Sequence, residues 1–177
     1  MNNRVSWYKL VRGSELEQGD ILFNLPVVEL PVDFPWPLQE GAVIQSEPSV
    51  YSRDAIVISQ SCDLQHPGKL EFVAFCPVYS FEDLGQFSKA GQRESLRQGR
   101  NVAYHLLDKC FIEYHERDYM IVEFKRIFSL PIDLAKRLAH DQGERLRLLS
   151  PYKEHLSQSF ARFFMRVGLP SDIPPFK

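Results

Sequence analysis

Two short apolar runs without polar alternation dominate the hydrophobic pattern of the chain. Residues 55–58 are Ala-Ile-Val-Ile and residues 72–76 are Phe-Val-Ala-Phe-Cys, and the polar segment between them contains Pro67 and Gly68. Runs this short, rich in β-branched and aromatic residues, predict strands rather than helices. Because neither run alternates, we expect two adjacent antiparallel strands that are buried on both faces.

Weaker patterns predict further strands around this pair. Gly19-Asp20 is a turn signal in front of a short strand at residues 21–25. Two more strands are expected at residues 102–107 and 110–114, and an alternating pattern over residues 119–128 predicts another. The sequence therefore predicts a sheet of about five to seven strands.

The segment from residue 26 to residue 52 is rich in proline, with prolines at positions 26, 31, 35, 37 and 48. Proline excludes helix and disfavours a central strand, so we expect a long irregular or edge-strand excursion. Residues 1–18 are expected to form a short extended arm anchored by Trp7, Tyr8 and Leu10.

Helical patterns occupy the rest of the chain. Residues 81–100 have helical character, and a helix is expected from about Pro131 to Asp141. The last helix is predicted to start at Ser150-Pro151 and to stop at Gly168. Its apolar stripe, in which Phe160 and Phe164 are expected to be buried, comprises Tyr152, Leu156, Phe160, Phe163, Phe164 and Val167.

Composition fits one globular domain of 177 residues, with 44% hydrophobic and 25% charged residues. The net charge of −2 argues against a general electrostatic attraction of the whole surface to nucleic acid. The charge is unevenly distributed: residues 1–52 have a balance of −4, whereas residues 125–166 have a balance of +5. This asymmetry is compatible with a basic face or with ordinary solvated helix surfaces.

Three cysteines without a CxxC spacing argue against a disulfide framework and against a standard zinc module. No N-terminal leader pattern and no apolar run near 18 residues is present in the sequence. We therefore expect a cytoplasmic protein without a membrane segment, a bound metal or a cofactor.

Three short pieces resemble the MazF/PemK toxin family. They are Gly19-Asp20-Ile21, then Arg53 to Ser59 with the sequence RDAIVIS, then Phe75 to Ser80 with the sequence FCPVYS. The resemblance implies an SH3-like β-barrel and, in active members, metal-independent RNA cleavage by homodimers. The family's catalytic arginine matches Arg53, and its catalytic threonine or serine matches the position of Tyr79 followed by Ser80. This chain departs from the family by having Asp54 in place of proline and Tyr79 in place of threonine.

The resemblance and the residues together predict a candidate catalytic and ligand-binding site. Arg53 would stabilise the charge on a phosphorane, with Ser80 and Asp63 assisting; the alternative for Arg53 is an ordinary surface arginine. Cys62 beside Asp63 is either a thiol nucleophile or a small buried cysteine that closes a strand. Other expected ligand contacts, for which structural roles remain equally open, are Gln60, Ser61, Cys62, Tyr79, His105, Arg145 and Arg147. The two last arginines, with Lys153, could hold phosphate or could pair with Glu144 and Glu154.

The sequence thus predicts an α+β protein with a single domain over residues 1–177: a partly open SH3-like barrel with a helical insertion and C-terminal helices. The barrel core would span about residues 19–128, and a helical cap about residues 129–170. Two functions stay open. One is a bacterial or phage RNA-binding protein that acts as an endoribonuclease toxin. The other is a non-enzymatic module whose residues 26–52 and Gln60–Asp63 loop hold a protein partner, such as an antitoxin or a defence-system component.

Overall fold

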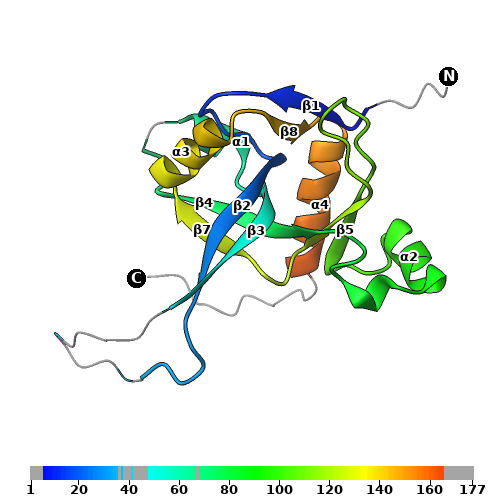
Figure 1. Ribbon diagram of the computed structural model, residues 1–177, viewed down its shortest axis with the longest axis horizontal. Helices are drawn as coiled ribbons and strands as arrows, with labels where there is room; N and C mark the ends of the chain where they lie inside the picture. The colour runs from blue at the N-terminus through cyan, green and yellow to red at the C-terminus, as the bar shows by residue number, and fades with distance from the viewer. Residues whose placement is uncertain (1–5, 36, 38–40, 42–47, 67, 166–177) are drawn as a thin grey trace, which may run out of the picture.

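The computed structural model describes residues 6–35, 37, 41, 48–66 and 68–165. They form an α+β fold built on one eight-stranded antiparallel sheet, as the sequence predicted at the level of fold class (Figure 1). The strands are β1 (Tyr8–Val11), β2 (Asp20–Glu29), β3 (Ser49–Val57), β4 (Phe72–Tyr79), β5 (Tyr104–Leu107), β6 (Met120–Glu123), β7 (Phe128–Pro131) and β8 (Arg145–Leu148).

The sheet is open rather than closed into a barrel. Its order is β1-β8-β2-β3-β4-β6-β5, and β7 pairs with β4 beside this path. Within the described residues β1 pairs only with β8, β5 only with β6 and β7 only with β4, so that these three strands are edges. Closure into a barrel would require edge strands to pair with each other.

The central strand pair is confirmed. β3 and β4 are antiparallel, with Ile56 opposite Cys76 and Val57 opposite Phe75. Both faces are covered, because Ile56 and Cys76 pack in the cluster that contains Leu156 of α4 (Tyr152–Phe164). The intervening residues, Ala55 and Val57, pack on the opposite face against Ala135 and Ala139 of α3 (Ile132–Gln142), and Figure 1 shows the two helices on either side of the central strands.

The flanks of the proline-rich excursion are more regular than predicted. β2 and β3 continue pairing as far as Glu29 and Ser49, which makes a two-stranded ribbon that projects from the body (Figure 1). Pro26 lies within this ribbon, opposite Ser52. It is tolerated because β2 pairs with β8 only at Asp20 and Ile21, so the outer edge of β2 is unpaired at Pro26. Residues 36, 38–40 and 42–47 lie outside the described residues.

Two strand predictions were wrong in detail. The pattern over residues 119–128 is divided between β6, which pairs with the end of β4, and β7, which pairs with its beginning. Residues 110–114 do not form a strand: Cys110 makes a single bridge with Arg117, and the chain reverses at Tyr114, whose φ is 64°. The arm at residues 8–11 and residues 145–148 pair as β1 and β8, an interaction that the sequence interpretation missed.

Helices follow the predicted order with one addition, α1 (Ser61–Gln65), inside the expected polar loop. A 3₁₀ turn (Gly85–Phe87) and α2 (Ala90–Arg97) occupy the predicted helical segment. In α4 Leu156 is fully buried, but Phe160 is half-buried and Phe164 is 57% exposed, so the predicted burial of both phenylalanines was wrong. Val167 and Gly168 lie outside the described residues. Among the described helices, none has the length and apolar character needed to cross a membrane.

Candidate functional site

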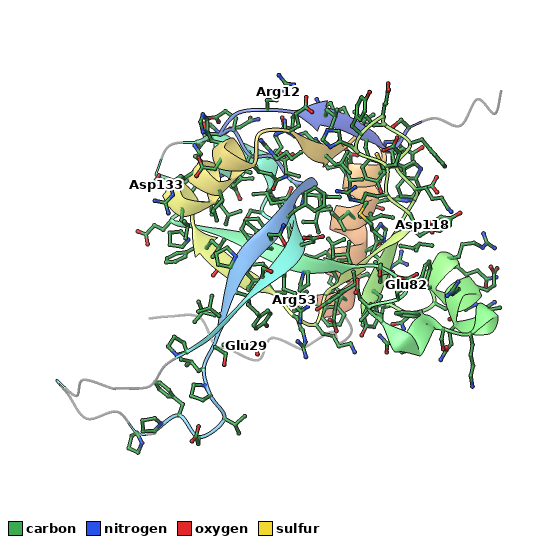
Figure 2. The ribbon with its side chains drawn as sticks, in the orientation of Figure 1. Arg12, Glu29, Arg53, Glu82, Asp118 and Asp133 are labelled. Atoms are coloured by element: carbon green, nitrogen blue, oxygen red, sulfur yellow. The ribbon has the colours of Figure 1, made fainter. Side chains whose placement is uncertain are left out.

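Arg53 lies in β3 where the ribbon joins the body of the sheet (Figure 2). Its Cζ atom is 4.8 Å from the ring centroid of Tyr51 and 5.7 Å from that of Tyr79. The three side chains line a pocket of about 220 Å³, and Arg126 lines it from the turn between β6 and β7. A cation on aromatic faces, beside a second cation, is an arrangement suited to a negatively charged ligand.

Strand register explains why these side chains meet. Ala55 pairs with Pro77, so two residues further along the antiparallel pair Arg53 comes opposite Tyr79. Tyr51 and Arg53 are two residues apart in one strand and therefore share a face. β7 pairs with the other edge of β4, and this pairing brings Arg126 to the pocket.

Within the described residues, Arg53 has no direct carboxylate partner. No hydrogen bond or ion pair to Arg53 occurs among the described residues, and its Nε atom is buried without an acceptor. Leaving a buried donor unpaired is unfavourable, so an anionic oxygen placed there would be stabilised. Arg126 is exposed and, in the described part of the chain, likewise has no carboxylate partner.

The two tyrosines differ in their hydroxyl groups. Tyr51 donates a hydrogen bond to Glu29, and this bond raises the pKa of Tyr51. Burial, and then the charge of Glu123, raise the pKa of Tyr79. Tyr79 therefore stays a neutral phenol near pH 7 and could donate a hydrogen bond to a ligand.

Ser80 follows Tyr79 and lines an adjoining pocket of about 140 Å³ that Tyr79 also lines. Its hydroxyl donates to Asp83 Oδ2 at 2.8 Å, and its backbone N–H donates to the same oxygen. These bonds, with a smaller contribution from Arg53, lower the pKa of Asp83. Ser80 therefore lies at the Arg53 end of the sheet, with its hydroxyl committed to Asp83.

Asp63 lies elsewhere, contrary to the expectation that it shares one mouth with Arg53 and Ser80. It is in α1, beyond the end of β3, whereas Arg53 precedes Val57 by four residues and Ser80 follows the end of β4. In an antiparallel pair the connecting segment and the outer ends lie at opposite ends of the strands. Asp63 forms an ion pair with Lys69, and this contact, followed by that with Cys62, lowers its pKa.

The neighbours of Asp63 connect the loop to the rest of the molecule. Gln60 donates to Ser157 Oγ at 3.2 Å, and Ser61 Oγ accepts from the backbone N–H of Gln18 at 3.1 Å. Cys62 is exposed, so the interpretation of it as a small buried cysteine was wrong. Its Sγ lies 3.5 Å from Asp63 Oδ1. These contacts attach α1 to the body of the protein, away from the Arg53 pocket.

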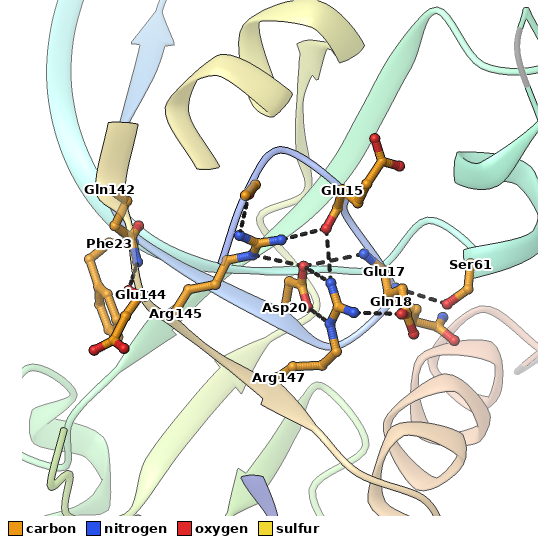
Figure 3. Close-up of polar contacts among 11 residues, drawn as sticks. Glu15, Glu17, Gln18, Asp20, Phe23, Ser61, Gln142, Glu144, Arg145 and Arg147 are labelled. Atoms are coloured by element: carbon orange, nitrogen blue, oxygen red, sulfur yellow. Dashed lines mark hydrogen bonds and ion pairs between the residues drawn. The ribbon is translucent and has the colours of Figure 1, made fainter. Parts of the chain in front are cut away.

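Arg145 and Arg147 are in β8 and converge on Asp20 (Figure 3). Arg145 is fully buried; its Nε donates to Asp20 Oδ2 at 2.9 Å and its Nη1 donates to Gly13 O at 2.7 Å. Arg147 pairs with both Asp20 and Glu17. These partners, rather than the expected Glu144 and Glu154, neutralise the two guanidinium groups, which are occupied by the protein's own acceptors.

His105 is in β5 and lines a hollow on the side of α4 that shares no lining residue with the Arg53 pocket. Its Nε2 atom is buried without a hydrogen-bond partner. Burial, and then the charge of His155, lower the pKa of His105 to about 4, so its ring is neutral at pH 7. The described residues contain no group of three or more histidines, cysteines or carboxylates that could hold a metal ion.

Sequence reasoning thus found Arg53, Tyr79 and Ser80 but missed Tyr51 and Arg126. The spacing of Tyr51 and Arg53 along one strand was a visible signal. Arg126 required knowledge that the pattern at residues 119–128 bends into two strands. No protein-family model matches the chain, and no curated protein matches it significantly.

Proposed function

We propose that this protein binds single-stranded RNA, with Arg53 and Arg126 each contacting a backbone phosphate and a base or ribose lying against Tyr51 and Tyr79. The observation that carries the proposal is the guanidinium of Arg53, without a direct carboxylate partner among the described residues, between two tyrosine rings at the mouth of a pocket. Aromatic faces combined with cations are the usual means of binding single-stranded nucleic acid.

The proposal includes a divergent relationship to the MazF/PemK family, in which the β2-β3-β4-β7 part of the sheet corresponds to an SH3-like barrel. It is supported by the position of Arg53 and Tyr79-Ser80, the residues that match the family's catalytic positions, at one end of β3 and β4. The proposed activity is binding rather than cleavage. Among the described lining residues of the pocket, the one carboxylate is Glu29, which accepts the Tyr51 hydroxyl and is poorly placed to act as a general base.

Fluorescence anisotropy with a labelled single-stranded RNA tests this proposal. Arg53→Ala should weaken binding at least tenfold, about the effect of losing one charge-assisted contact. Arg137→Ala, which removes an exposed charge from α3 that does not line the pocket, is the matched control and should bind as the parent does. Equal affinity of Arg53→Ala and the parent would refute the proposal. Incubation of the RNA in EDTA measures cleavage separately, and metal-independent cleavage that Arg53→Ala abolishes would favour the toxin function.

A second function, capture of a protein partner, is favoured by the ribbon. Val28 and Val50 face each other across its two strands and are 60% and 63% exposed. Leu30, the first residue after β2, is 63% exposed. Exposed apolar side chains on a projecting strand pair commonly mark an interaction surface. Replacing Leu30 and Val50, which do not line the Arg53 pocket, by serine should leave RNA affinity unchanged if RNA is the ligand. It should abolish binding to a partner encoded by a neighbouring gene if the ribbon is the functional surface.

A further inference from the structure

A second hollow lies between β5, the segment at residues 96–102 and α4, and it has a volume of about 480 Å³. Its cationic side chains are Arg97 at the end of α2 and Arg162 on α4. His105 and His155 also line the hollow, and no carboxylate is among the described residues that line it. A hollow of this size is in the range of small-molecule sites, and its charge favours an anion.

The adjoining hollow provides an internal comparison. This adjoining hollow has a volume of about 660 Å³, and it shares Trp7, Arg97 and Leu106 with the hollow beside α4. Its lining cations are balanced by the carboxylates of Glu94, Asp108 and Asp118. The larger hollow is therefore the less suitable site for an anion, because carboxylates line it. The hollow beside α4 is the more suitable site, because no carboxylate is among its described lining residues.

One wall of the acid-free hollow is aromatic. The rings of Trp7 and Tyr152 stack with centroids 4.0 Å apart and an interplanar angle of 10°. Both side chains are half-buried, and Trp7 comes from the segment before β1 whereas Tyr152 begins α4. A stacked pair of this kind presents a flat apolar edge and outer ring faces, against which a planar heterocycle packs well.

Amide side chains complete the lining. Gln98 Nε2 already donates to Glu94, and Asn101 Oδ1 accepts from the backbone N–H of Ala103 at 3.3 Å. Gln158 makes no hydrogen bond with the described residues, so its amide offers both a donor and an acceptor, the groups that recognise the polar edge of a nucleobase. Arg162 is exposed on α4 and has no hydrogen bond or ion pair within the described part of the chain. Arg97 already pairs with Glu94, at 2.6 and 2.7 Å, so Arg162 is the cation most available to an incoming anion.

We propose that this hollow is a second binding site, separate from the Arg53 pocket, and that it takes a nucleotide, with its phosphate at Arg162 and its base against the Trp7–Tyr152 pair. A free mononucleotide and a nucleotide within an RNA chain share this chemistry. The site does not depend on the proposed function of Arg53.

Tryptophan fluorescence provides a direct measurement. The chain has two tryptophans, so Trp36→Phe leaves Trp7 as the sole reporter. Each of the four ribonucleoside 5′-monophosphates, ribose 5-phosphate, a six-nucleotide RNA and a hexaglutamate peptide would be titrated against this protein. We expect at least one mononucleotide to change Trp7 emission with saturation. Arg162→Ala should weaken that binding at least tenfold, and Arg137→Ala should change it less than twofold.

The controls separate this site from the other. Arg53→Ala should bind the mononucleotide as the parent does, even if it loses RNA. Saturation by the mononucleotide identifies free nucleotides as the source, whereas saturation by the six-nucleotide RNA alone, sensitive to Arg162→Ala, identifies RNA; either result supports the proposal. Failure of every nucleotide ligand to saturate, equal binding by Arg162→Ala and Arg137→Ala, or equal or tighter binding of ribose 5-phosphate or hexaglutamate would overturn it.

Discussion

Asp20 and Arg147 stand directly opposite each other in the pairing of β2 with β8, and the carboxylate of Asp20 also holds Arg145. The side chains of Asp20 and Arg145 are 0% exposed, and that of Arg147 is 9% exposed. The two guanidinium groups also bind the backbone oxygen of Glu15, so this buried network attaches the segment before β2 to β8.

Replacement of Asp20 by asparagine tests the network. It removes the one carboxylate that pairs with the buried Arg145 and leaves Arg147 paired with Glu17 alone, so we expect a loss of about 3–5 kcal/mol in the free energy of unfolding. Urea denaturation measures the loss. Glu94→Gln, which breaks the exposed pair with Arg97, is the control and should have little effect. Similar losses from both substitutions would mean that the buried network is no more important than a surface pair.

The different burial of two α4 side chains predicts different losses of stability when each is replaced by alanine. Leu156 is fully buried between the helix and the sheet, whereas Phe164 is 57% exposed. Leu156→Ala should therefore cost about 2–5 kcal/mol in the free energy of unfolding, and Phe164→Ala much less. The same denaturation measurement compares them. A larger loss for Phe164→Ala would show that the helix is oriented differently.

The main features of the fold could be predicted where one local signal dominated. The continuous apolar runs at residues 55–58 and 72–76 were sufficient to place β3 and β4 side by side. The burial of Phe164 could not be judged from helical spacing alone, because spacing indicates a face and not how far a neighbouring element extends along it. β8 was missed although its sequence, Arg-Leu-Arg-Leu, alternates as a strand does; its arginines are inside because Asp20 lies opposite.

His105 gives a pH dependence whose sign follows from its burial. The pKa of His105 in the folded protein is about 4, below the ordinary value of 6.5, so the unfolded chain binds the proton more readily. His105 therefore leaves the free energy of unfolding undiminished above about pH 6.5 and lowers it as the pH falls from there through about 4, by about 3 kcal/mol in total. Urea denaturation at pH 4.5 and 7.5 should show a smaller difference for His105→Gln than for the parent. Equal differences would contradict the assignment.

Thiol accessibility checks the position of the α1 loop. Cys62 is exposed, whereas Cys76 and Cys110 are buried, and burial raises the pKa of Cys76 to about 12. A thiol reagent such as DTNB should therefore react rapidly with one thiol in the native protein, and Cys62→Ser should remove that phase. Rapid reaction of two or three thiols would show that the core is more open than described.

The candidate site could be predicted in part, for a topological reason. Arg53 and Tyr79-Ser80 were found because both border the central strand pair. Asp63 was misplaced because the segment that connects two antiparallel strands lies at the opposite end from their outer ends. This separation could have been inferred from the predicted strand pair alone. Arg145 and Arg147 looked like a basic cluster because their acidic partners, Glu17 and Asp20, are more than 120 residues away in the chain.

The salt dependence of RNA binding tests the central proposal most directly. Each phosphate of a single strand that a protein cation contacts adds about −0.7 to the slope of log K against log salt concentration. If Arg53 and Arg126 both contact phosphates, Arg53→Gln should lower affinity and reduce the magnitude of the slope by about 0.7. Arg126→Gln should do the same, and Arg137→Gln neither. Slopes that are identical for the parent and Arg53→Gln would contradict phosphate binding at Arg53.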